Sequence, residues 1–174
     1  NPSGRASLDE PTFTDLEPKE AGLSGDGYIW KYLYTIKPSD IVKFDSTFFM
    51  PVPKDWTTTT DANISAVRNN ASTSGQLKIV NITNRGVGLG TANRTYTRVP
   101  IKGDGSGAEC TIAINNNSKV EKVTVSKGGS GYTFGTVDLS AGNVPTGTTA
   151  PIFDVIIPPQ GGHGADIYRE LGAR

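Results

Sequence analysis

The sequence has few of the residues on which disulfide bonding, metal binding and catalysis depend. Its 174 residues include one cysteine, one histidine and one methionine. A single cysteine excludes an internal disulfide and a cysteine-based zinc cluster. We expect Cys110 to be a small buried hydrophobic residue. Because the chain has neither a second histidine nor a second cysteine, we predict no metal site. We expect no cofactor either.

An excess of charge of either sign is also missing. Lysine plus arginine and aspartate plus glutamate each number 17, so the formal net charge is zero. A neutral chain lacks the basic excess typical of electrostatic nucleic-acid binders, and it has no basic run suited to acidic lipid. No apolar run approaches the ~20 residues that a transmembrane helix requires. We therefore expect neither nucleic acid nor membrane as a partner.

Glycine and proline are abundant, whereas hydrophobic residues are not. The chain contains 21 glycines and 11 prolines, and its hydrophobic content is 35%. This composition is typical of many short strands joined by turns, around modest cores that can need a neighbour to cover them. The predicted fold class is mainly β, with small antiparallel sheets or a sandwich and few short helices.

Composition and pattern divide the chain into five segments. They are an extended lead-in at 1–25, an aromatic strand segment at 26–56, a linker or loop at 57–75, a duplicated β unit at 76–157, and a Gly-rich loop and tail at 158–174. The linker is rich in Thr, Asn and Ser, and a short helix near residues 63–69 is the alternative there.

An aromatic stripe marks the second segment. The side chains on one side of this extended stretch are Tyr28, Trp30, Tyr32, Tyr34 and Ile36. Aromatic and β-branched residues favour a pleated surface, so the alternation predicts a strand covered on both faces and ended by a proline. We expect the stripe to lie in a core or subunit contact, and a sugar-binding groove is the alternative.

Two short elements follow the stripe. Residues 39–42 predict one helical turn with Ser39 as its N-cap. Residues 48–53 form a second extended apolar stretch that contains Pro51 and Pro53. Since proline cannot donate to a β-ladder, this stretch is interpreted as a sheet edge or as a strap across the surface.

The most informative feature is an internal repeat. Residues 76–88 align without gaps to residues 119–131, with apolar residues and glycines at matching places. Further strand patterns follow at 96–101 and 108–114 in the first copy, and at 134–139 and 150–157 in the second. We predict two three-stranded β units, 76–114 and 119–157, that superpose and cover each other's apolar faces. The residues expected to be largely buried are Val80, Ile82, Val123 and Val125.

Motifs that could carry chemistry are weak. His163, in a Gly-Gly-His-Gly loop, is better explained by a hydrogen bond to a neighbour than by proton transfer. Residues 103–107 lack the spacing of a phosphate-binding loop and favour a hairpin turn. Asp104 and Glu109 supply only part of a calcium loop. Because the acidic residues are scattered, no converging carboxylate pair is predicted, and we do not expect an enzyme.

A family resemblance comes from two stretches. Residues 25–38 contain the run Gly-Asp-Gly-Tyr-Ile-Trp-Lys-Tyr, and residues 49–53 read Phe-Met-Pro-Val-Pro. They resemble the baseplate wedge protein encoded by gene eight of T-even-like contractile-tailed phages, which has a G-D-G-Y-x-W-x-Y run and a later proline-x-proline motif. The match covers about residues 24–56. The Gly-Gly-His-Gly loop with residues 170–172 resembles a motif of marine relatives, whereas the duplicated unit is more similar to β repeats of phage tail and fibre proteins.

The resemblance implies a β-dominated fold, pairing into a homodimer, and contact with other baseplate wedge proteins. It implies no catalytic residue. The residues assigned to a protein-interaction or core motif are Asp26, Tyr28, Trp30, Tyr32, Pro51, Pro53 and His163.

The expected function is that of a structural component of a phage tail baseplate wedge, located in the virion and assembled in the host cytoplasm. One alternative is a tail-tip receptor- or carbohydrate-binding module, with Trp30 or Trp56 as a stacking platform. The other is a tail-associated hydrolase domain.

Overall fold

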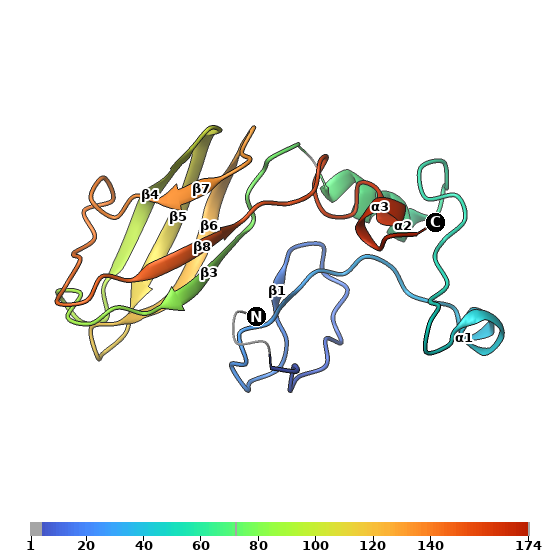
Figure 1. The fold of residues 1–174 in the computed structure, drawn as a ribbon, viewed down its shortest axis with the longest axis horizontal. Helices are drawn as coiled ribbons and strands as arrows, with labels where there is room; N and C mark the ends of the chain where they lie inside the picture. Colours follow the sequence, from blue (N-terminus) through green and yellow to red (C-terminus); the bar gives the residue numbers. More distant parts are fainter. Residues whose placement is uncertain (1–4, 72, 174) are drawn as a thin grey trace. The chain divides into compact units, whose positions relative to one another are not determined.

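A computed structural model describes residues 5–71 and 73–173 of the chain (Figure 1). These residues form two compact units. Unit 1 consists of residues 5–71 and 163–173, and unit 2 consists of residues 73–162. Strands account for 29% of the structure and helices for 12%, which confirms the mainly β class.

Unit 1 contains little regular structure. Its elements are β1 (Lys19–Glu20), β2 (Ile29–Trp30), α1 (Pro38–Phe44), α2 (Ala62–Asn70) and α3 (Ile167–Glu170). β1 and β2 form an antiparallel ladder of two residues each. The long strand predicted along the aromatic stripe is therefore wrong beyond Trp30. Alternation alone does not make a strand, because the ladder needs a partner of equal length and β1 is too short to provide one.

Helix α1 begins at Pro38, one residue earlier than expected. Its N-cap is Lys37, which makes no side-chain capping hydrogen bond, so Ser39 lies inside the first turn and is not the cap. Proline suits the first turn of a helix, where its missing N–H has no intrahelical acceptor. None of the residues in α1 is buried.

Helix α2 forms within the segment predicted as a linker or loop, as in the alternative for residues 63–69. The Asp61 carboxylate caps it and accepts from the N–H groups of Asn63 and Ile64 at 2.9 and 3.1 Å. Val67 is fully buried on its inner face. A capped helix with a buried residue is a packed element, so the loop interpretation is wrong for residues 62–70.

Unit 2 has a strand near each of the six predicted positions. They are β3 (Ile79–Asn84), β4 (Thr95–Gly103), β5 (Ser106–Ile114), β6 (Val120–Ser130), β7 (Gly135–Val137) and β8 (Ile152–Ile156). Four of them form a sheet in the order β6-β5-β4-β7, and β3 pairs with β8 (Figure 1). Every ladder is antiparallel.

Pairing between the strands crosses from one repeat copy to the other. The first strand of each copy pairs with the third strand of the other copy, which gives the pairs β3–β8 and β6–β5. The two middle strands, β4 and β7, also pair with each other. Only β4 and β5 pair within a copy. The prediction of two separate three-stranded sheets is therefore wrong. Exchanging strands pairs edges that a small isolated sheet would leave exposed.

The sheets of unit 2 curl into a half-barrel. Contacts between β3 and β6 and between β7 and β8 extend the neighbour order to β6-β5-β4-β7-β8-β3. If each strand is replaced by its counterpart in the other repeat copy, the same strand order results, read in the opposite direction. The repeat is thus folded as one body with approximate two-fold symmetry in its strand order.

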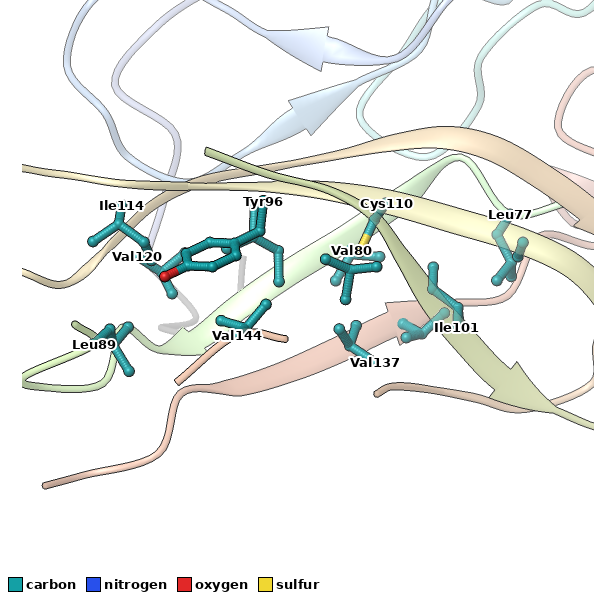
Figure 2. Packing of buried hydrophobic residues seen from close by; sticks show 14 of the residues in the cluster. Leu77, Val80, Leu89, Tyr96, Ile101, Cys110, Ile114, Val120, Val137 and Val144 are labelled. Atoms are coloured by element: carbon teal, nitrogen blue, oxygen red, sulfur yellow. The ribbon is translucent and has the colours of Figure 1, made fainter. Parts of the chain in front are cut away.

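The core of unit 2 fills the inside of this curl. Figure 2 shows Val80, Ile101, Cys110 and Val137 pointing toward a common interior from four different strands. Cys110 is fully buried as expected, and burial raises the pKa of its thiol to about 12. Val80 is also buried. The other three residues expected to be largely buried are half-buried and pack against the same core: Ile82, Val123 and Val125.

Candidate functional site

The core of unit 1 is built around Trp56. Its side chain is 0% exposed, and its indole Nε1 donates to the carbonyl oxygen of Gly164 at 3.0 Å. Val67 and Ile167 complete the fully buried set. The ring of Tyr34 meets the indole edge-on, with ring centroids 6.3 Å apart. Trp56 thus joins the early and late segments of unit 1, and it cannot serve as the exposed sugar platform considered from the sequence.

Tyrosine hydroxyls hold the two motif prolines. Tyr34 donates to the Pro51 carbonyl at 2.9 Å, and Tyr168 donates to the Pro53 carbonyl at 2.7 Å. Burial raises the pKa of Tyr34, with a smaller contribution from the Asp45 carboxylate, so this hydroxyl stays a donor at neutral pH. Residues 51–53 belong to no strand and are half-buried. Of the two interpretations of this stretch, the strap is the one observed.

His163 lies in the loop before α3 and contacts that helix. Its Nδ1 lies 3.1 Å from a carboxylate oxygen of Glu170. The second carboxylate oxygen accepts from the N–H of Gly164 at 2.5 Å. Glu170 belongs to α3, whose N-cap Asp166 accepts from the Arg169 N–H at 3.2 Å. These contacts give His163 a structural partner next to the carbonyl that holds Trp56.

Asp26 organises the Gly-Asp-Gly turn. Its carboxylate accepts from the Ser7 hydroxyl at 2.7 Å and from the N–H groups of Leu8 and Tyr28 at 2.8 and 2.9 Å. These hydrogen bonds, led by that of Ser7, lower the pKa of Asp26 to about 2. The flanking Gly25 has φ of 63°, a conformation that costs glycine little. Asp26 therefore ties the lead-in to the start of the aromatic stripe.

Tyr28 and Trp30 stack on each other, with ring centroids 5.7 Å apart and an interplanar angle of 23°. Both are half-buried, as is Tyr32, which packs against the Trp56 cluster. The Trp30 Nε1 atom is buried and has no hydrogen-bond acceptor among the residues that the structure describes. The stripe was expected in a core or in a subunit contact, and within this chain these three residues are only partly buried. Its place in a subunit contact stays a prediction.

A stretch of large apolar side chains in unit 1 lies open to solvent. We call residues 41–50 the apolar segment, and its exposed members are Ile41, Val42, Phe44, Phe48, Phe49 and Met50. Each of them is between 45% and 87% exposed. Sequence reasoning missed this surface, because it assigned the first half to a helical turn and the second half to a strap. The available signal was the number of apolar residues in two elements too short to bury them.

The hairpin at residues 103–107 borders a shallow hollow of about 390 Å³ in unit 2. The Asp104 carboxylate accepts from the N–H groups of Thr133 and Phe134 at 2.9 and 3.3 Å, so it links two loops. A Cβ at Gly105 would lie 2.4 Å from the ring of Tyr132. The β4–β5 ladder confirms the hairpin interpretation. This glycine-rich turn is explained by packing and needs no ligand.

No group of three or more His, Cys, Asp or Glu side chains that could hold a metal ion occurs within residues 5–71 and 73–173. In the same ranges, no helix is long and apolar enough to cross a membrane. No protein-family model, curated protein or solved structure matches this chain. The likeness to baseplate wedge proteins stays a prediction from the motif residues, and the geometry of unit 1 is the guide to function.

Proposed function

We propose that this chain is a structural component of a phage tail baseplate wedge and acts by binding neighbouring baseplate proteins during virion assembly. The observation that carries this proposal is the apolar segment, where six large apolar side chains within ten residues are at least 45% exposed. Large apolar side chains left exposed close together in one segment are typical of an interaction site in a folded protein.

The contrast between the two units supports the same function. Of the twelve exposed large hydrophobic residues in the described chain, nine lie in unit 1 and three in unit 2. The main core cluster of unit 1 has only three fully buried members: Trp56, Val67 and Ile167. A unit that buries few large apolar side chains and exposes many of them is stabilised when a neighbouring protein covers the exposed ones.

Two tyrosine hydroxyls hold the strap that follows the apolar segment. Tyr34 holds Pro51 directly after the apolar segment, and Tyr168 holds Pro53. The extended strap is therefore positioned by the core before any partner binds, which lowers the entropy lost on association. Since the net charge is zero, long-range steering contributes little, and binding should depend weakly on salt. No catalytic step is assigned to these residues.

Co-expression pull-downs with the other wedge proteins of the same phage test the proposal. We expect the folded chain to retain at least one of them at both low and high ionic strength. The variant Phe48→Ser/Phe49→Ser should reduce capture at least tenfold, because it removes apolar contact area. Phe134→Ser/Ile152→Ser is the matched control, with two exposed apolar residues of unit 2, and should bind like the wild type. Failure of the folded wild-type chain to retain any wedge protein contradicts the proposal.

A carbohydrate- or receptor-binding role is the second candidate, and the Tyr28–Trp30 pair favours it. The stacked rings are half-buried, and the buried Trp30 N–H has no acceptor within the described ranges. An unmet donor of this kind costs about 1–3 kcal/mol. Because the atom is buried, a ligand oxygen reaches it only if the surrounding side chains move apart. Glycan-array binding that survives in the apolar-segment variant but is lost in Trp30→Phe, which keeps a ring without the N–H, would support this role instead.

A further inference from the structure

Three residues from separate segments of unit 1 meet at one side-chain amide. The Lys31 Nζ atom donates to the Asn70 Oδ1 atom at 2.7 Å, and the Asn70 Nδ2 atom donates to a Glu17 carboxylate oxygen at 3.0 Å. Both contacts agree on the orientation of the amide, because the lysine donates to an oxygen and the carboxylate accepts from an N–H. A nitrogen nucleophile and a carboxylate thus bind the two ends of the same amide group.

The secondary structure of unit 1 brings these residues together. The antiparallel ladder pairs the first residue of β1 with the last residue of β2, so the chain before β1 runs beside the chain after β2. This places Glu17 near Lys31, and the Lys31 Nζ atom also donates to the carbonyl oxygen of Leu16 at 2.7 Å. Asn70 is the last residue of α2, a capped helix with a buried inner face. Lys31 is therefore held between two elements.

The acyl carbon of the amide is within reach of the amine. Since a carbonyl bond is ~1.23 Å long, the Lys31 Nζ atom lies within ~3.9 Å of the Asn70 Cγ atom. Amides react slowly with amines in solution, but well-oriented groups reach effective molarities of about 10⁵–10⁸ M. Lys31 and Asn70 are half-buried, which limits competition from water, and the exposed position of Glu17 leaves ammonia a way out.

We propose that Lys31 and Asn70 become joined by an isopeptide bond once the chain has folded, with Glu17 as the proton carrier. The unprotonated Nζ attacks Cγ, so the Nζ–Cγ bond forms and the carbonyl electron pair moves to Oδ1. Glu17 takes a proton from Nζ and passes it to Nδ2, the atom that it already contacts. The carbonyl then reforms, the Cγ–Nδ2 bond breaks and ammonia leaves. Nothing is oxidised or reduced, and the Glu17 carboxylate is regenerated.

The bond would give unit 1 a covalent closure in place of a disulfide. A disulfide within the chain is excluded by the single cysteine, and the main core cluster of unit 1 has three fully buried members. The linked residues are 39 positions apart, and the closed loop contains α1, the apolar segment and Trp56. Such a link restricts the unfolded chain as a disulfide does. It goes beyond the docking function and holds whichever protein covers the apolar segment.

Mass spectrometry of the denatured full chain provides the first test. Linkage releases one ammonia, so the 18.4 kDa chain should be lighter than its sequence mass by about 17 Da. Trypsin does not cut after an acylated lysine, and it cuts poorly at Lys37, which precedes a proline. Digestion should therefore yield a branched peptide in which residues 20–43 are joined to residues 69–78.

Variants of the three residues provide the second test, with circular dichroism to show that each one is folded. Lys31→Arg keeps the charge and the donors but should abolish the mass loss, because a guanidinium is not a nucleophile at neutral pH. Glu17→Gln keeps a hydrogen-bond acceptor but carries no proton, so linkage should form roughly tenfold more slowly or less. Asn69→Ser changes the exposed neighbour of Asn70 in α2 and should link like the wild type.

The outcomes are distinct from those of the pull-downs, because none of them requires a wedge protein. A folded wild-type chain that keeps its full sequence mass, even after prolonged incubation at alkaline pH, overturns the isopeptide bond. Loss of ammonia that persists in Lys31→Arg also overturns it, since a succinimide at an asparagine gives the same mass change without a branched peptide. Linkage of Glu17→Gln at the wild-type rate overturns the role of Glu17, while the branched peptide still establishes the bond.

Discussion

At the scale of single residues, the two tryptophans of unit 1 have different surroundings. Trp56 is fully buried, and its N–H is satisfied by Gly164. Trp30 is half-buried, and its N–H lacks an acceptor in the described chain. Stability should therefore depend on Trp56, while Trp30 is free to contribute to recognition.

The first prediction compares these two residues. Trp56→Ala should destabilise unit 1 by about 3–5 kcal/mol, because it opens a cavity between α2 and α3. Trp30→Ala should cost less, about 1–2 kcal/mol, because part of its surface is already in water. Hydrogen exchange of the α2 amides measures the local stability. Equal losses in the two variants would contradict the central role of Trp56.

A second residue-scale prediction concerns acid stability. Hydrogen bonds from the Thr133 hydroxyl, then from the N–H groups of Thr133 and Phe134, lower the pKa of Asp104 from 3.8 to about 2. A carboxyl group whose pKa is lowered on folding stabilises the fold fully above its unfolded value of 3.8. That contribution is lost as the pH falls through 2.

Urea midpoints of unit 2 should therefore fall between pH 4 and pH 2, and fall less in Asp104→Asn, which cannot ionise. Thr133→Val should also flatten the profile, because it removes the leading hydrogen bond to Asp104. Some acid sensitivity should persist in both variants, since the Ala141 N–H and Lys102 also lower the pKa of Asp138. A profile that keeps its wild-type steepness in Asp104→Asn would rule out a contribution from this carboxylate.

At the scale of elements, the exchanged pairing of the repeat makes its two copies depend on each other. β3 has its ladder partner in β8, and β6 has its partner in β5. A single copy would retain at most one hairpin with uncovered apolar faces. An isolated hairpin is marginal in water, so neither copy should fold alone.

Cleavage between the copies tests this dependence. A protease site inserted after Asn116, at an exposed turn between β5 and β6, allows one protein to be measured before and after cutting. The cut unit 2 should keep its β-sheet circular dichroism while its halves stay together. Separated halves should lose it and regain it on mixing. A half that unfolds cooperatively by itself would show that the copies are independent sheets after all.

At the scale of the whole molecule, the two units differ in how many of their apolar side chains they bury. Unit 2 closes its repeat into a curl around one apolar core. Unit 1 keeps a small core around Trp56 and leaves the apolar segment uncovered. This division suits an assembly component, because a self-sufficient unit can carry a second unit that is completed by neighbours.

The sequence by itself determined what depends on local pattern. Alternation and turn glycines placed all the strands of unit 2, the hairpin at 103–107 and the burial of Cys110, since strand propensity, turn conformation and side-chain polarity are properties of short stretches. Two residues also indicated α2: Asp61 is a favourable N-cap, and Val67 is an apolar residue on the inner face. The polar composition around them nevertheless favoured a loop.

Only the tertiary structure decided what depends on distant partners. The strand that pairs with β3 lies some seventy residues away in the other repeat copy, and two copies with the same pattern offer equivalent edges to each other. Aromatic content likewise did not distinguish Trp56, held by Gly164 from the far end of the chain, from the exposed Phe48 and Phe49. Burial and pairing are set by contacts between segments remote in sequence, and a local pattern carries no record of which segments meet.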